Sequence, residues 1–335
     1  MLFLVLGLPG WFAERCQRLT RGLVERAYGS ADLIRGDTLE EVALQLLHHG
    51  APSIVLASHN AVGRIRSAIA EAGKPFIVAY DDPMMALAHL VRHREMDLIA
   101  ATRLVAGGCA SVIGFGATPG ALVLAAHAVN GDSMSLATAI AGHLGLDVDQ
   151  NQLDDVVRLA DNGDGAGDAQ DWLSWWDTLP LAERAIAHGA IAPFIAHFGG
   201  AELRPITWSR ELFFVGDGSS ERADGAIDIT GRARCLLSGP DILLPPGLWL
   251  VSMIFEFSPE AAEHDFSIEF VGGAASVRDM LRPEAGGVVE VETTLEFETL
   301  PSHPIYLRLW SERAAFDGTV ALRHVRLTRL ARDEA

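Results

Sequence analysis

The stretch that decides the fold of the first half is Leu2–Leu6 (LFLVL), followed by the turn Gly7-Leu8-Pro9-Gly10 and the helical pattern WFAERCQRL of residues 11–19. A buried strand that runs through a Gly/Pro turn into a helix is typical of the start of a nucleotide-binding α/β domain. The turn lacks the Lys and Ser/Thr of the phosphate-binding GxxxxGK[ST] motif. The sequence therefore predicts a fold more firmly than a reaction.

The pattern of strand and helix continues beyond this first unit. Residues 52–57 (PSIVLA) and Phe76–Tyr80 predict two further buried strands, and helices are expected near residues 11–28 and 38–49. Short apolar runs separated by helices indicate a parallel sheet built from βαβ units. Residues 84–200 are Ala-rich and predict a helical extension. We expect residues 1–205 to form one α/β domain with a P-loop-like parallel sheet.

The sequence changes character near Pro205. Alternating apolar and polar residues separated by Gly, Pro and Asp turns are typical of a β-sandwich. The candidate strands are ELFFVGD, AIDITG, CLLSG, LWLVSMIFEFS, DFSIEFVG, VVEVETTLEFE, IYLRLWS and TVALRHVRLTRL. The predicted fold class is α/β followed by all-β, with residues 206–331 forming an antiparallel, jelly-roll-like β-sandwich.

Composition excludes several classes of protein. The 335 residues carry a net charge of −18, which argues against a nucleic-acid-binding protein. The N-terminal apolar run is too short for a signal peptide and no apolar run is long enough to span a membrane, so we expect a cytoplasmic protein. Three widely separated cysteines predict neither a disulfide framework nor a structural zinc site. Residues 1–103 have balanced charge, with 11 basic and 11 acidic residues, so an anionic ligand is compatible with this region.

Polar and glycine residues follow the three predicted strands of the first domain. In an open parallel sheet, ligands bind beyond the carboxyl ends of the strands, and these strand ends converge if the strands are neighbours. The alternative interpretation is that Ser58 and Asp82 cap helices and that residues 7–10 form a plain turn. The candidate cofactor-binding residues are Gly7, Gly10, Ser58, Asn60 and Arg64, and the candidate catalytic residues are His59 and Asp81.

The first domain loosely resembles the P-loop sulfotransferases. In that family the first loop reads P-[KR]-[ST]-G-[ST]-[ST]-[WF] and wraps the phosphosulfate of the donor. Here Pro9, Gly10 and an aromatic residue, Trp11 or Phe12, match that pattern, whereas the basic and hydroxyl residues are absent. The resemblance implies a nucleotide-type fold over residues 1–210, with a degenerate and catalytically silent donor site.

The predicted sandwich resembles the jelly-roll modules that bind carbohydrate, with CLLSGPDILLPPGLWLVSMIFEF as the most similar segment. Aromatic faces stack on sugar rings, and the candidate sugar-binding residues are Trp249, Tyr306 and Trp310. The alternative is that these rings pack in the core of the sandwich.

Together these patterns predict a glycan-associated cytoplasmic protein, in the production of surface or extracellular polysaccharide. The alternative is a transferase that moves a group from a nucleotide-type donor to a sugar. No metal is expected, and the partners to consider are glycans, polysaccharide-synthesis proteins or a second copy of the chain.

Overall fold

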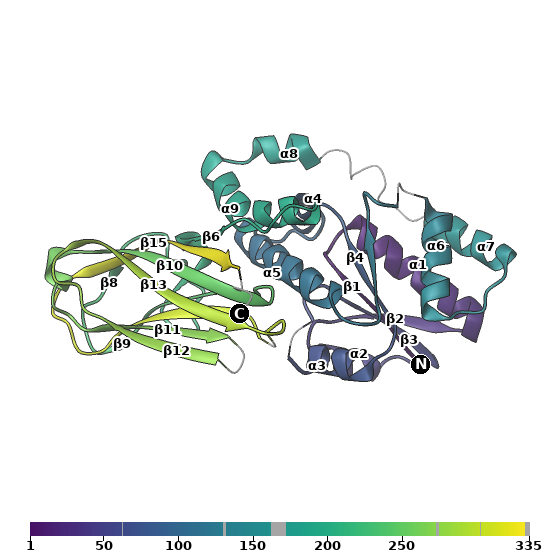
Figure 1. Cartoon of the computed structure of the whole chain (residues 1–335), viewed down its shortest axis with the longest axis horizontal. Helices are drawn as coiled ribbons and strands as arrows, with labels where there is room; N and C mark the ends of the chain where they lie inside the picture. Colours follow the sequence, from purple (N-terminus) through teal and green to yellow (C-terminus); the bar gives the residue numbers. More distant parts are fainter. Residues whose placement is uncertain (62, 130–131, 162–171, 273–274, 302, 332–335) are drawn as a thin grey trace. The chain divides into compact units, whose positions relative to one another are not determined.

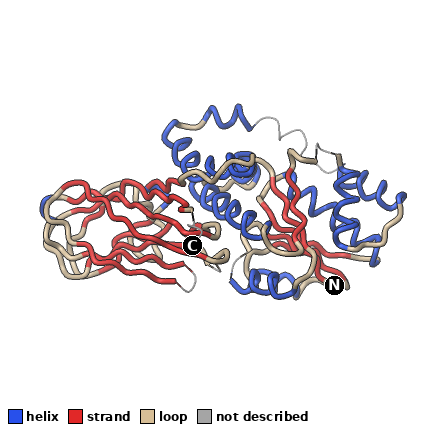
Figure 2. Tube along the Cα trace, in the orientation of Figure 1, coloured by secondary structure: helices blue, strands red, loops and turns tan. Residues whose placement is uncertain are grey.

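The computed structural model describes residues 1–61, 63–129, 132–161, 172–272, 275–301 and 303–331. The chain divides into two compact units. The first comprises Met1–Met96 and Gly107–Leu179, and the second comprises Asp97–Ala106 and Pro180–Ala335. An α/β arrangement is followed by an all-β arrangement, as predicted (Figures 1 and 2).

The first unit contains a five-stranded parallel sheet with the order β2-β3-β1-β4-β5. The strand ends after residues 6, 58 and 80 are neighbours, because β3, β1 and β4 are adjacent. The connection from β1 crosses β3 to reach β2, whereas the later connections run across the sheet toward β5. Connections from the neighbouring strands β1 and β3 therefore run in opposite directions, and the carboxyl ends of these two strands mark a topological switch point. Its strands are β1 (Leu2–Gly7), β2 (Ala31–Arg35), β3 (Ser53–Ser58), β4 (Phe76–Tyr80) and β5 (Ala121–Ala125).

Helices cover this sheet, and α1, α6 and α7 pack together against it (Figure 1). Local sequence explains where several helices begin. Thr38 and Glu41 form a capping box at the start of α2, and Asp82 caps α4 with Pro83 as its first residue. The helices are α1 (Trp11–Tyr28), α2 (Leu39–Leu46), α3 (Gly63–Ala72), α4 (Pro83–His93), α5 (Leu98–Gly116), α6 (Ser133–Leu144), α7 (Gln150–Asp161), α8 (Trp172–Thr178) and α9 (Leu181–Phe198).

Two strands of this sheet were not predicted. β2 is a five-residue segment, ADLIR, with a polar residue at its second position and a charged residue at its end. β5 has the sequence ALVLA and lies in the Ala-rich region for which helix was expected. Short apolar runs do not distinguish strand from helix by periodicity alone, and pairing with β3 and β4 decides these two cases.

The second unit contains two antiparallel sheets that enclose a common core, a β-sandwich (Figure 1). We call them the β10 sheet, ordered β13-β10-β15-β6 with β8 paired to β15, and the β14 sheet, ordered β12-β11-β14-β9-β7. Short 3-10 helices occur at Arg210–Leu212 and Pro259–Ala261. The strands are β6 (Ile206–Ser209), β7 (Phe214–Val215), β8 (Ile227–Asp228), β9 (Arg234–Ile242), β10 (Gly247–Phe257), β11 (Phe266–Gly272), β12 (Ala275–Leu281), β13 (Gly287–Phe297), β14 (Ile305–Ser311) and β15 (Thr319–Leu330).

All eight predicted strand segments contain a strand, and β6 and β12 are additional. The boundary predicted between residues 205 and 206 falls between α9 and β6, which pack closely within the second unit. Gly189 of α9 allows this close approach, because a Cβ at this position would lie only 3.1 Å from the Thr207 carbonyl oxygen of β6.

The expectation that no apolar run is long enough to span a membrane is corrected by helix α5, which is long and apolar enough by length and composition alone. Within α5, 72% of the most apolar stretch is buried inside the protein. A helix in the core of a protein has the same length, composition and burial.

Candidate functional site

The loop at residues 7–10, predicted to contact a nucleotide-type donor, is buried along its whole length. The Leu8 backbone N–H donates to the Ala79 carbonyl oxygen at 3.2 Å, and a Cβ at Gly10 would lie 3.9 Å from the Ala86 Cα of α4. A phosphate-binding loop needs free N–H groups that point at the ligand. The Leu8 N–H is bound to β4, and the cofactor-binding role of Gly7 and Gly10 stays a prediction.

Asp37, which follows β2, occupies the polar tip of β3. Its Oδ1 accepts hydrogen bonds from the Ser58 hydroxyl at 2.5 Å and from the backbone N–H groups of His59 at 2.8 Å and Asn60 at 2.9 Å. The Asn60 side-chain oxygen accepts from the Ser111 hydroxyl at 3.0 Å. Sequence analysis missed this role for Asp37. The Ser58 hydroxyl and the Asn60 backbone N–H, at two positions predicted to bind a cofactor, donate to this carboxylate of the chain itself.

His59 connects β3 to β1. Its Nδ1 lies 3.0 Å from the Gly7 carbonyl oxygen, which can only accept, so Nδ1 carries the proton. Burial lowers the pKa of His59 and favours the neutral ring. The cavity between Gly7, Ser58, His59 and Ser111 measures about 10 Å³, close to the volume that one water molecule requires.

Asp81 lies at the tip of β4 and belongs to a different part of the sheet edge. β1 separates β3 from β4, so the ends of these two strands lie about 10 Å apart. Burial raises the pKa of Asp81, whose Oδ1 accepts from the Asp82 N–H at 2.8 Å. The catalytic roles of His59 and Asp81 stay predictions. Arg64 lies in α3, and its side chain is outside the described part of the structure.

Trp249, one of the three aromatic residues predicted to bind sugar, lies in the core of the sandwich. Its side chain is fully buried in β10, and its Nε1 donates to the Pro245 carbonyl oxygen at 3.0 Å. The expectation of an exposed ring at Trp249 is corrected, because the alternating pattern of β10 turns this position toward the opposite sheet.

Tyr306 and Trp310 lie on the solvent-facing side of β14. The odd-numbered residues of this strand, among them Ile305, Leu307 and Leu309, are buried in the sandwich core, so the even-numbered residues face outward. Trp310 Nε1 lies 3.3 Å from Glu269 Oε2 on the neighbouring strand β11. This bond holds the indole across the surface of the β14 sheet, where it is half-buried.

Charged groups lie between and beside the two rings. Arg308, midway between them in sequence, places its Cζ 4.7 Å from the Tyr306 ring centroid. Its Nη2 lies 3.3 Å from Asp217 Oδ1, and its Nη1 lies 3.6 Å from Glu269 Oε2. Sequence analysis missed Arg308 and Glu269. The alternation of IYLRLWS was the available signal, since it places Arg308 on the same face as the two aromatic residues.

Beside Trp310, a second set of hydrogen-bonded polar residues lies on the same face. Trp310 pairs with Ser267 of β11, and Arg278 of β12 donates through Nε to the Ser267 hydroxyl at 3.1 Å. Arg278 also pairs with Glu312 at 2.5 Å, and the Ser267 hydroxyl donates to Glu312. These bonds lower the pKa of Glu312 and keep it charged. The face thus combines two aromatic rings with fixed donors and acceptors.

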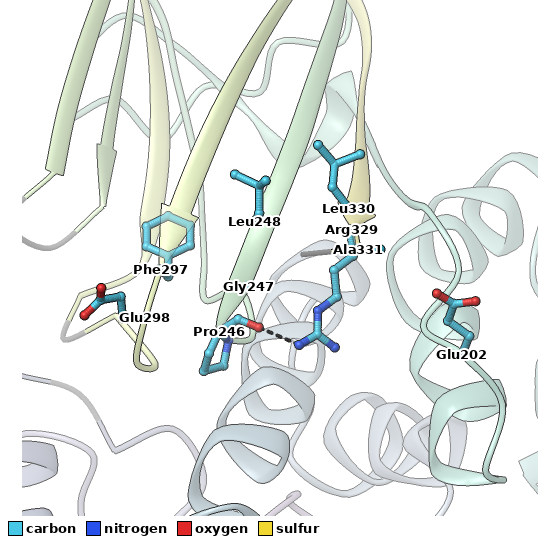
Figure 3. Close-up of a pocket in the computed structure, with 9 residues that line it drawn as sticks. All are labelled: Glu202, Pro246, Gly247, Leu248, Phe297, Glu298, Arg329, Leu330 and Ala331. Carbon is cyan, nitrogen blue, oxygen red and sulfur yellow. Dashed lines mark hydrogen bonds between the residues drawn. The ribbon is translucent and has the colours of Figure 1, made fainter. Parts of the chain in front are cut away.

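A second concavity of about 370 Å³ lies at the ends of β10, β13 and β15 (Figure 3). The Arg329 side chain lines it and donates through Nη2 to the Pro246 carbonyl oxygen at 2.9 Å. Gly247 makes room for this side chain, because a Cβ there would lie 2.8 Å from Arg329 Nε. Glu202 and Glu298 lie on either side of Arg329. No sequence pattern pointed to this concavity.

Within the described residues, no group of three or more His, Cys, Asp or Glu side chains could hold a metal ion.

No protein-family model matches the sequence, and no curated protein matches it. Similar solved structures include a family 16 carbohydrate-binding module, at 10% identity and a TM-score of 0.24, covering 38% of this chain and 79% of that one. The C-terminal family 6 module of a marine laminarinase from Zobellia galactanivorans covers 37% of this chain and 99% of that one, at 16% identity and a TM-score of 0.27.

The xylan-binding CBM22-1 domain of Xyn10C from Paenibacillus barcinonensis is also similar, at 14% identity and a TM-score of 0.26 over 38% of this chain and 95% of that one. At these identities and TM-scores, no inference about a ligand rests on the similarity.

Proposed function

We propose that the second unit binds a glycan on the solvent-facing side of the β14 sheet, along Tyr306, Arg308 and Trp310. The observation that carries the proposal is the Trp310 indole, held across the sheet surface by Glu269 with charged hydrogen-bonding groups beside it. Aromatic rings supply apolar contact area at a low cost in conformational entropy, and a sugar ring has both an apolar face and hydroxyl groups.

The spacing along β14 supports an oligosaccharide chain rather than a single sugar. Tyr306 and Trp310 are four residues apart on one face, which corresponds to about 13 Å along a strand. This distance exceeds the width of one sugar ring. Carboxylates accept hydrogen bonds from hydroxyl groups and guanidinium groups donate them, so Glu269 and Arg308 supply both partners that sugar hydroxyls need.

The finer expectations from the sequence stay predictions. They are a sulfotransferase-like origin of the first unit, a cytoplasmic location and a role in polysaccharide production. Packing of residues 7–10 and the engagement of Ser58 with Asp37 support a structural role for the strand ends of this unit.

The test is glycan affinity of the Trp310→Ala variant. Native affinity electrophoresis against polysaccharide-containing gels, followed by calorimetry with the retained glycan, should show binding by the unmodified protein. Loss of a central aromatic contact costs about 1–3 kcal/mol, so we expect roughly fivefold to 150-fold weaker binding by Trp310→Ala.

The matched control is Phe316→Ala, which removes the ring of a phenylalanine that is 98% exposed elsewhere in the same unit. This variant should bind as the unmodified protein does. Trp310→Phe should recover part of the lost affinity, because it restores an aromatic face. Equal affinity of Trp310→Ala and the unmodified protein, or no binding to any glycan, would contradict the proposal.

A further inference from the structure

We infer that the glycan bound on the β14 sheet is neutral, and that this face discriminates against sulfated and uronic-acid polymers. The inference rests on the proposed function and concerns the substrate class of the same site. Its basis is the set of ion pairs that surround the two aromatic rings.

Arg308, the guanidinium closest to Tyr306, already has two carboxylate partners. Asp217 lies on one side at 3.3 Å and Glu269 on the other at 3.6 Å, while the Tyr306 ring lies against the Cζ at 4.7 Å. An incoming sulfate or carboxylate would have to displace one of these carboxylates or lie close to both. Like charges at such distances repel, and the repulsion is stronger where the groups are only partly exposed to water.

At the Trp310 end of the face, the arginine is likewise already paired with a carboxylate. Arg278 is paired with Glu312 at 2.5 Å, and Glu312 also accepts from the Ser267 hydroxyl. The low pKa of Glu312 keeps this carboxylate charged near neutral pH. The protein as a whole carries a net charge of −18, which adds an unfavourable long-range field for an anionic polymer.

A neutral glycan avoids these costs. Its hydroxyl groups can donate to the remaining lone pairs of Asp217, Glu269 and Glu312 without displacing an arginine. Carboxylate oxygens have about four lone-pair sites in total, so an ion-paired carboxylate retains capacity for a hydroxyl donor. The fixed ion pairs therefore form a hydrogen-bonding frame around the rings and leave no guanidinium without a partner at Arg278 or Arg308.

The experiment compares each polymer with its own charged derivative. The full-length protein is tested by calorimetry and affinity electrophoresis with xylan, laminarin, galactan and dextran, and with the sulfated or carboxymethylated form of each. Alginate and polygalacturonate complete the acidic set. We expect a neutral polymer to bind, its charged derivative to bind at least tenfold more weakly, and the neutral affinity to be nearly unchanged by added salt.

Tighter binding of an acidic polymer than of its neutral parent, still lost in Trp310→Ala, would overturn this inference while the proposed glycan site stands. Binding of no polymer would overturn both.

A second variant tests the ion pairs directly. Asp217→Asn removes one of the two carboxylates on Arg308, and we expect it to reduce the discrimination against the charged derivative by a factor of about two to five, the upper range for a partly exposed charge pair. Glu256→Gln is the matched control, because it removes the carboxylate 3.1 Å from Arg323 on the β10 sheet. Unchanged discrimination in Asp217→Asn, or an equal change in Glu256→Gln, would contradict the role assigned to the ion pairs.

Discussion

At the scale of single residues, Asp37 links two strand ends of the first unit through one carboxylate oxygen. That oxygen accepts from Ser58, His59 and Asn60, and it lies where bound anions are often found beyond parallel strands. Backbone N–H groups that lose such a partner in a partly buried position cost more free energy than the bond itself contributes. Asp37 is therefore important for stability.

We expect Asp37→Ala to lower the free energy of unfolding by about 2–4 kcal/mol, because two backbone N–H groups and one hydroxyl lose their acceptor. Urea denaturation followed by tryptophan fluorescence measures the change. Asp37→Asn is the control, since it keeps a carbonyl oxygen at the same position and should lose clearly less. Equal losses in both variants would indicate that the oxygen is not the acceptor that matters.

At the scale of elements, the carboxyl end of β1 is defined by its close contact with β4. Gly7 pairs with Ala79, and a Cβ at Gly7 would lie 1.7 Å from the Ala79 carbonyl oxygen. The φ of Gly7 is +150°, a conformation that other residues rarely adopt. The glycine is thus required by the approach of two strands, which explains its place in the turn without any ligand.

We expect Gly7→Ala to destabilise the first unit by more than about 3 kcal/mol, through backbone strain together with the steric clash. Chemical denaturation is the measurement, with soluble yield as a second readout if the variant unfolds. Gly29→Ala is the matched control. Gly29 also has a positive φ, of +92°, but open space around its Cβ position, so it should cost only about 1 kcal/mol. A smaller loss for Gly7→Ala than for Gly29→Ala would refute the steric explanation.

At the scale of the whole molecule, several groups make stability depend on pH. The His89 ring, whose Nε2 lies 3.6 Å from Glu14 Oε1, and the Arg94 guanidinium at 2.7 Å together lower the pKa of Glu14 from 4.5 to about 2. Its contribution is present above pH 4.5 and is lost as the pH falls toward 2. Burial lowers the pKa of His59, so the unfolded chain takes up this proton more readily as the pH falls below 6.5. Both effects destabilise the fold in acid.

Burial raises the pKa of Asp81 and of Asp82, and these two groups act in the opposite direction. We expect the acid-induced loss between pH 7 and 3 to be smaller in Glu14→Gln than in the unmodified protein by about 1–3 kcal/mol. Urea denaturation at several pH values measures it. Glu25→Gln, which removes the partly exposed carboxylate 2.8 Å from Arg21 on the same helix, should keep nearly the full acid-induced loss, and an equal pH profile for Glu14→Gln would contradict the assignment.

Local patterns in the sequence predicted most of the strands and helices. The apolar runs LFLVL and SIVLA predicted central strands, and the alternation in IYLRLWS placed Tyr306 and Trp310 on one face of β14. These features depend on side-chain periodicity and turn residues, which are local properties of the chain.

Tertiary structure decided the rest, because the remaining questions concern which distant residues meet. ALVLA became strand β5 by pairing with β4, and Trp249 became a core residue because the opposite sheet covers it. Asp37 reached Ser58 across 21 residues of sequence, and Glu269 reached Trp310 across 41. Periodicity states which side of an element is apolar. Whether a polar strand tip binds a ligand or a carboxylate of the same chain depends on long-range packing, which no local pattern encodes.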